Sequence, residues 1–270
     1  MNYFGFGNNS INLKADDVEE EDYNRVKISK FIAGTFIKWK SDLDAEIKLG
    51  INYQTFKVDN TLGRFVSDEF NANNAIFDTQ KFINTEASYH FKNTDNPAFS
   101  TMGMKTELIA GYTSSLNNDG DFGYLIPSIS FQHKVIPSGQ LVFATKLKSH
   151  YTFGNSYQFY QAASIGGNDG LRGFRNQRFT DKNSFYHSSD IRLNLRRFKT
   201  SLIPLNIGVF GGFDYGTVWG QQNSTFKNSK FNTSIGGGVF FNAANMISGN
   251  ISTFNSDDGL RVAFTFGFTF

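Results

Sequence analysis

Residues 259–270 read GLRVAFTFGFTF, and this closing segment decides the fold class. Every second residue from Leu260 to Phe270 is apolar, and the residues between them are small or polar. Because successive side chains of a strand point to opposite faces, the segment has one apolar and one polar face. On a soluble edge strand the apolar face would be an aggregation site. Lipid contact removes that problem, so the segment predicts a strand of a transmembrane β-barrel with its polar side toward the lumen.

The same alternation recurs along the chain from about residue 24 onward. The clearest case is 43–53, where Leu43, Ile47 and Ile51 share one face with other apolar residues and Asp44, Glu46 and Lys48 share the opposite face. With the closing segment, the repeats predict about twelve strands, each near the roughly 9–11 residues that a tilted membrane strand needs. The further alternating segments are 83–91, 102–110, 125–131, 141–151, 189–195, 206–219, 235–241 and 246–254.

Composition supports a barrel and excludes several other classes. The chain has 31 Phe and 11 Tyr, yet its mean hydropathy is −0.35, as expected when only alternate residues face lipid. No apolar run approaches the roughly 18 residues of a spanning helix. The formal charge of +2 comes from scattered basic residues, so no nucleic-acid partner is expected. Cysteine is absent, which excludes disulfides and thiolate metal sites.

The connections alternate in length, as hairpins do when they close tightly on one side of a membrane and loosely on the other. Short turns are predicted near 40–42 and 137–139, and long polar links at 59–79 and 155–184. A soluble β-barrel or sandwich would also alternate. Such a fold packs branched aliphatics inside and has no need for so many Phe and Tyr near strand ends, which favours the membrane barrel.

Three segments indicate which family of membrane barrels the chain resembles. They are SIGGNDGLRGFRNQRF at 164–179, HSSDIRLNLRR at 187–197 and GVFGGFDYGTVWG at 208–220. This pattern resembles the barrel of the bacterial surface antigen superfamily, which includes BamA-type outer-membrane assembly factors, two-partner secretion transporters and Bacteroidetes barrels fused to secreted enzymes. The resemblance implies a bacterial outer-membrane location, an antiparallel barrel of sixteen strands and a long loop folded into its lumen.

The resemblance also implies a contact between the loop and the barrel wall, carried over to Arg172 and Asp214. Strand parity agrees, because Asp214 faces the lumen if Val209 and Phe213 face lipid. The planar fork of Arg172 suits a carboxylate partner. The loop motif comprises Gly166, Gly167, Leu171, Arg172, Gly173 and Phe174, and Asp190 and Arg192 are further lumenal wall residues.

Two other interpretations of the glycine-rich segment are a flexible loop and a phosphate-binding cradle. A cradle needs a helix whose N-terminus meets the anion, and no helical period follows the loop. The glycines Gly166, Gly167, Gly170 and Gly173 instead suit a tightly threaded backbone.

The aromatic end of the chain carries a second resemblance. Phe266, Phe268 and Phe270 resemble the C-terminal signal that outer-membrane proteins present to the assembly machinery.

The strand count departs from the family. Five strands follow the loop and about seven precede it, and the opening NYFGFGN resembles a segment just after the fourth strand of the enzyme-fused Bacteroidetes barrels. Open edges in lipid are costly, so the chain either closes with about twelve strands or is part of a larger barrel, and we favour the latter. No signal peptide precedes the first strand. Residues 1–270 are therefore expected to form a single barrel domain, truncated at its N-terminus and without periplasmic or enzyme domains.

No catalytic, metal or cofactor site is predicted. The acidic clusters 118–121 and 257–259 lack the further ligands of a calcium loop and are interpreted as turns. The function expected from the resemblance is protein assembly or translocation, with membrane lipids, unfolded outer-membrane or secreted proteins and accessory lipoproteins as partners. The alternatives are an anchor or secretion channel for a fused enzyme domain, and a passive diffusion porin.

Overall fold

The fold is a single curved antiparallel sheet with a loop on its concave side. A computed structural model describes residues 2–3, 23, 25–96, 99–117, 120–154, 156–199, 204–220, 230–243 and 247–266. Phe268 and Phe270, predicted as parts of the C-terminal signal, lie outside these residues, as do Asn118 and Asp119. Among the described residues, no helix is long and apolar enough to cross a membrane.

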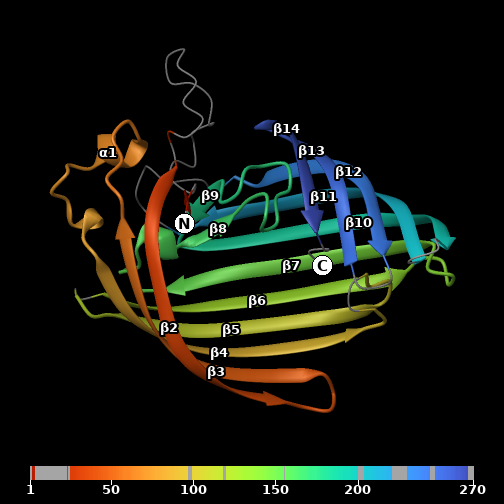
Figure 1. Cartoon of the computed structure of the whole chain (residues 1–270), viewed down its shortest axis with the longest axis horizontal. Helices are drawn as coiled ribbons and strands as arrows, with labels where there is room; N and C mark the ends of the chain where they lie inside the picture. The colour runs from red at the N-terminus through yellow and green to blue at the C-terminus, as the bar shows by residue number, and fades with distance from the viewer. Residues whose placement is uncertain are drawn as a thin grey trace.

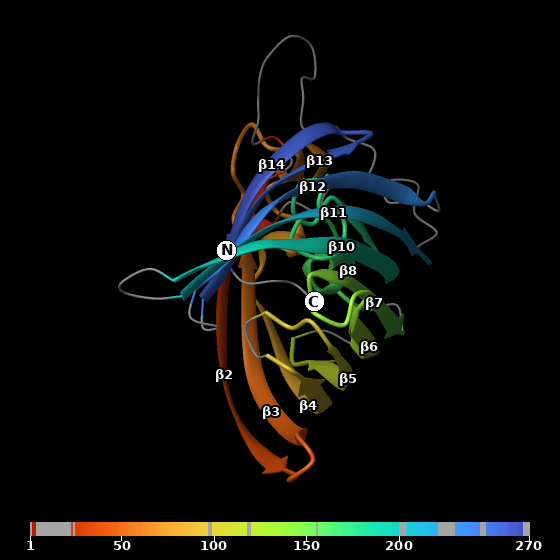
Figure 2. The ribbon, with the colours of Figure 1, turned by 90° about the vertical axis from the view of Figure 1, so that its right-hand side faces the viewer.

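Twelve strands form the large sheet, each paired with its neighbour in chain order except that β7 pairs with β10. The sheet bends into a deep trough (Figures 1 and 2), and among the described strands no pairing joins β14 to β1 or β2. The strands are β1 (Asn2–Tyr3), β2 (Val26–Lys40), β3 (Ala45–Val58), β4 (Gln80–Thr94), β5 (Gly103–Ser115), β6 (Asp121–Lys134), β7 (Leu141–Phe153), β10 (Asn183–Lys199), β11 (Pro204–Trp219), β12 (Asn232–Ala243), β13 (Ile247–Ser256) and β14 (Gly259–Phe266).

The predicted strand number is confirmed, with five strands of the large sheet after the loop and seven before it. The strand predicted at 43–53 is shifted, because Leu43 belongs to the turn 42–44 and β3 begins at Ala45 and continues to Val58. Asp44 in that turn has a φ of 58°. The left-handed conformation reverses the chain before the alternating pattern can enter the sheet.

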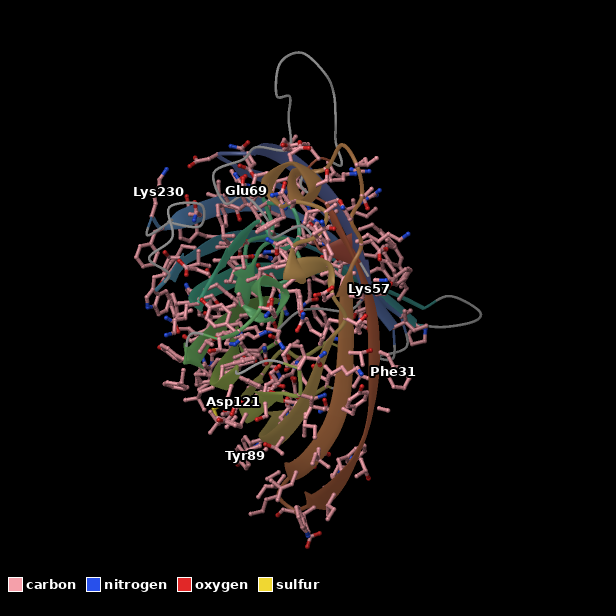
Figure 3. All side chains as sticks on the ribbon, turned by 90° about the vertical axis from the view of Figure 1, so that its left-hand side faces the viewer. Phe31, Lys57, Glu69, Tyr89, Asp121 and Lys230 are labelled. Carbon is pink, nitrogen blue, oxygen red and sulfur yellow. The ribbon has the colours of Figure 1, made fainter. Side chains whose placement is uncertain are left out.

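The convex face of the sheet is apolar and exposed. Ile47, Leu49 and Ile51 are each close to half exposed, at 47%, 47% and 49%. Phe31 and Tyr89 point outward from β2 and β4 (Figure 3). On the closing strand, Leu260, Val262, Phe264 and Phe266 are exposed, while Arg261 between them faces the trough. A soluble protein would bury these side chains, whereas lipid is a favourable neighbour for them.

The link at 59–79 was predicted to be polar, but it also contains apolar residues that pack against one end of the trough. It contains α1 (Phe65–Glu69) and η1 (Ala75–Phe77). Val66 of α1 is buried against Val26, Ile28, Phe56, Val58 and Phe82, with Phe65, Phe70 and Phe77 packed around this cluster. Its apolar residues therefore cap the trough on the side of the long loops.

Candidate functional site

The connection from β7 to β10 is the segment that the sequence singled out, and it lies inside the trough (Figure 2). It contains η2 (Phe159–Gln161) and the short strands β8 (Ala163–Ile165) and β9 (Phe179–Asp181), which pair with each other and not with the large sheet. We call residues 163–181 the lumenal loop. Its apolar residues form a buried cluster with the wall: Ile165, Leu171, Phe174, Phe179, Tyr186 and Val218.

A tight turn starts the motif of the lumenal loop. Gly166 forms isolated bridges with Asp169 and Gly170. Gly170 has a φ of 99°, and a Cβ at this position would overlap the ring of Tyr186 on β10. Only glycine satisfies both the left-handed conformation and the close approach to the wall. The turn delivers Leu171 and Arg172 to the wall.

Arg172 makes the central contact of the site, with Asp214 of β11. Its Nε donates to both carboxylate oxygens of Asp214 at 3.1 and 3.0 Å, its Nη2 donates to Oδ1 at 2.6 Å, and its backbone N–H donates to Oδ2 at 3.0 Å. Asp214 is completely buried. Ser234 of β12, which is the cross-strand partner of Asp214, donates to Oδ2 at 2.9 Å. The carboxylate is therefore held by one arginine side chain, one backbone N–H and one hydroxyl, which compensates for its burial.

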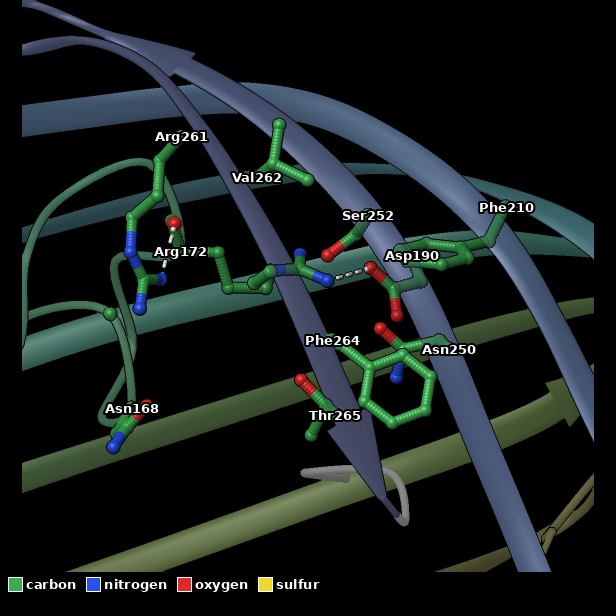
Figure 4. A pocket seen from close by; sticks show the side chains of 12 residues that line it. Asn168, Arg172, Asp190, Phe210, Asn250, Ser252, Arg261, Val262, Phe264 and Thr265 are labelled. Carbon is green, nitrogen blue, oxygen red and sulfur yellow. Dashed lines mark hydrogen bonds and ion pairs between the residues drawn. The ribbon is translucent and has the colours of Figure 1, made fainter.

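A second carboxylate shares the same guanidinium. Arg172 Nη1 lies 2.7 Å from Asp190 Oδ1 on β10 (Figure 4). The other oxygen of Asp190 lies 3.3 Å from Arg192 Nη2. Two arginines and two aspartates thus form one lumenal network that includes all four charged residues singled out in the sequence.

Aromatic rings and charges together favour a protonated Arg172. The guanidinium carbon lies 4.2 Å from the centroid of Phe254 on β13. Burial alone would lower the pKa of Arg172, but Asp190 and Asp214 outweigh burial and raise that pKa above its ordinary value. Arg172 is therefore suited to pair with both carboxylates of the wall.

The tip of the lumenal loop is tied to β7 and β10. Asp169 lies 3.1 Å from Lys148 Nζ, and Tyr186 donates a hydrogen bond of 3.0 Å to it. Ser188 donates to the carbonyl of Gly170 at 2.8 Å. Of these residues, only Gly170 was singled out from the sequence, although Lys148 and Ser188 share the lumenal parity of their strands.

The contacts between the lumenal loop and the last hairpin were not predicted from the sequence. Arg178 pairs with Asp258, at 2.6 Å between Nε and Oδ2. Arg261 donates to the carbonyl of Arg172 at 3.0 Å. Residues 257–258 form a turn, as predicted, and Gly259 already begins β14, but Asp258 has this additional partner. The only sequence signal for such a contact was the position of Arg261 on the polar face of the closing segment.

A cavity of about 430 Å³ lies between the lumenal loop and the last strands (Figure 4). Its polar lining comes from Arg172, Asp190, Asn250, Ser252 and Arg261. Of the predicted motif, Gly167 also lines the cavity, while Leu171 and Phe174 are buried in the apolar cluster. Phe266 is not part of this site, because it lies on the outer face of β14.

Solved outer-membrane structures are similar to this fold, among them BamA and CdiB. BamA from Haemophilus ducreyi lacking POTRA domains 1–3 matches with a TM-score of 0.67 at 18% identity, over 90% of this chain and 54% of that one. CdiB from Escherichia coli matches with a TM-score of 0.59 at 13% identity, over 90% of this chain and 45% of that one. The chain therefore spans about half the length of these structures. No curated protein matches it in sequence.

Residues 22–241 match the family described as haemolysin secretion/activation protein ShlB/FhaC/HecB. The match includes the lumenal loop and the strands β10 and β11 that hold Arg172. Together with the exposed apolar face of the sheet, it places the protein in the bacterial outer membrane. The chain belongs to the haemolysin secretion/activation protein family ShlB/FhaC/HecB, and its fold is the outer-membrane β-barrel of that family.

Proposed function

We propose that the chain is the membrane barrel of a machine that assembles or translocates proteins at the outer membrane. The observation that carries this proposal is the lumenal loop, which crosses the trough and is held there by Arg172 between Asp190 and Asp214. Buried ion pairs that hold a loop carry a desolvation penalty, and a passive pore has no use for such a loop. In a translocating barrel it would keep the lumen closed until a client protein arrives.

The lumenal wall is suited to an unfolded polypeptide. Polar and charged side chains line it from β3 to β7, among them Glu86, His90, Glu107 and Lys148. His90 and Glu107 lie 3.3 Å apart and are both partly exposed to the trough. A wall that carries both signs of charge offers hydrogen bonds without a strong preference for one sequence.

We further propose that unfolded outer-membrane or secreted proteins are the clients, that membrane lipids contact the convex face, and that accessory lipoproteins complete the machine. We propose no catalytic role for this barrel, because the charged groups gathered around the lumenal loop are engaged in structural ion pairs. Fusion to an enzyme domain and a larger, sixteen-stranded barrel stay predictions.

Deletion of the gene in its host tests the function. We expect one or a few proteins to disappear from the medium or the outer membrane, and to return when the wild-type gene is supplied. A strain that carries Arg172→Ala should restore them only in part. Unchanged proteomes after deletion would contradict the proposal.

Planar bilayers separate translocation from a diffusion porin. We expect the wild-type protein to conduct weakly, and Arg172→Ala to conduct more because the lumenal loop is released. Lys38→Ala, which removes an exposed ion pair with Glu46 on the first hairpin, is the matched control and should leave conductance unchanged. A large conductance that Arg172→Ala does not raise would favour the porin.

A further inference from the structure

The last hairpin, β13 and β14, has little support from the sheet itself. It is joined to the sheet by the pairing of β13 with β12, and β14 pairs with β13 alone among the described strands. A terminal hairpin is expected to open locally more easily than central strands. Its position therefore depends on whatever else holds it.

The lumenal loop contacts the turn between β13 and β14 through a largely buried ion pair. Arg178 donates to Asp258 through Nε at 2.6 Å and through Nη2 at 3.3 Å. The side chains of Arg178 and Asp258 are only 5% and 19% exposed. A two-pronged guanidinium–carboxylate contact of low exposure fixes orientation as well as distance.

Backbone carbonyls of the lumenal loop are the second set of contacts. Ser256, at the end of β13, donates to the carbonyl of Gly173 at 2.9 Å. Arg261, on β14, donates to the carbonyl of Arg172 at 3.0 Å. Both strands of the hairpin are therefore tied to two consecutive residues of the loop.

Glycines make this approach possible. An ideal Cβ at Gly173 would lie 2.6 Å from the Cβ of Ser234 and 3.0 Å from the Cβ of Ser256. An ideal Cβ at Gly167 would overlap the guanidinium of Arg261. These two motif glycines thus permit contact with the hairpin and its neighbour β12, whereas Gly170 permits contact with β10.

We propose that the lumenal loop is a clamp on the closing hairpin, and that Arg178 and Asp258 are the positioning residues that set where β14 lies. Arg172 connects the two ends of the clamp, because its side chain binds β10 and β11 while its carbonyl binds β14. The seating of the loop and the position of the closing strand are then one coupled equilibrium. A polypeptide that displaces the loop would therefore also loosen β14.

Hydrogen–deuterium exchange of the full chain in liposomes tests the clamp. In Arg178→Ala and in the milder Asp258→Asn, we expect the amides of 247–266 to exchange at least about tenfold faster, because local opening becomes easier. The amides of β4 and β5 should not change. Equal acceleration across the whole sheet, or none in the hairpin, would overturn the proposal.

A neighbouring ion pair is the matched control. Lys230 and Asp257 lie 3.1 Å apart next to the clamp, but both side chains are 72% exposed. Lys230→Ala should therefore leave exchange of the hairpin within about twofold of the wild type, as is usual for exposed pairs. An effect equal to that of Arg178→Ala would mean that any charge removed near this turn loosens it, which would overturn the specific role of Arg178.

A charge swap tests the pairing in the other direction. We expect Arg178→Asp alone and Asp258→Arg alone each to accelerate exchange in the hairpin, because each places two like charges side by side. The double variant, which restores an opposite-charge pair, should return exchange toward the wild-type rate. If the double variant exchanges as fast as the two single effects combined, Arg178 and Asp258 do not position β14 through their contact. These results do not depend on any client, so they stand apart from the test of transport.

Discussion

The first hairpin and the wall formed by β10 to β12 share one alternating pattern, but their lumenal side chains have different environments. Lys38 and Glu46 face the trough from β2 and β3 and stay 48% and 30% exposed. Asp190 and Asp214 face the same trough and are at most 1% exposed. The difference is the lumenal loop, which covers the second region and not the first. Burial of lumenal charges in this barrel is thus created by the loop rather than by the strands.

The largest expected effect is on the covered region. Arg172→Ala should lower the free energy of unfolding by about 3–5 kcal/mol, because it leaves the buried carboxylate of Asp214 without its arginine. Asp214→Ala should also lower it, but by less, because Arg172 keeps Asp190 as a partner. The double variant should lose much less than the sum. Urea unfolding followed by heat-modifiable gel mobility measures all three. Additive losses would contradict the direct pairing.

The turn of the lumenal loop should show the next effect. Gly170→Ala introduces both an unfavourable φ and an overlap with Tyr186, and should cost roughly 1–3 kcal/mol. Gly63→Ala is the control, since Gly63 has a φ of 73° but nothing within 4 Å of an added Cβ. Comparing the two variants separates the backbone cost from the contact with β10. Equal losses would mean that the approach to Tyr186 is unimportant.

A smaller, pH-dependent effect is expected at the turn between β4 and β5. Burial alone would raise the pKa of Asp95, but hydrogen bonds from Thr101 and Met102 and the ammonium of Lys134 outweigh it and lower the pKa. The stability that Asp95 contributes is therefore complete above its ordinary pKa of 3.8 and is lost as the pH falls through the lower folded value. The stability difference between wild type and Asp95→Asn should be larger at pH 7 than at pH 3. A difference that is constant with pH would contradict this assignment.

The smallest effect is expected on the uncovered hairpin. Lys38→Ala removes an ion pair of 3.0 Å that is open to solvent, and should change the free energy of unfolding by less than about 1 kcal/mol. The same urea experiment measures it. A loss as large as that of Arg172→Ala would show that the first hairpin is also covered in the membrane.

Much of the fold could be predicted from the sequence because strand parity is a local property. The faces of β3 and β14, the two long links and the number of strands follow from residues next to each other in the chain. The contact of Arg172 with Asp214 was also predicted, but it needed both parity and the resemblance to a family. The short turn near 40–42 was predicted, but its extension over Leu43 could not be predicted from alternation, because it depends on the left-handed conformation of Asp44.

The sequence by itself therefore determined the strands and their apolar faces, which favour a membrane barrel because lipid is a stable environment for such faces. The loop in the lumen was predicted only through the resemblance to a family. Only the tertiary structure decided which polar groups meet. Arg178 and Asp258 are 80 residues apart, and no local pattern relates them. Their contact exists because the loop, once held by Arg172 and the apolar cluster around Leu171, passes beside the last hairpin, so its physical cause is the packing of the whole barrel.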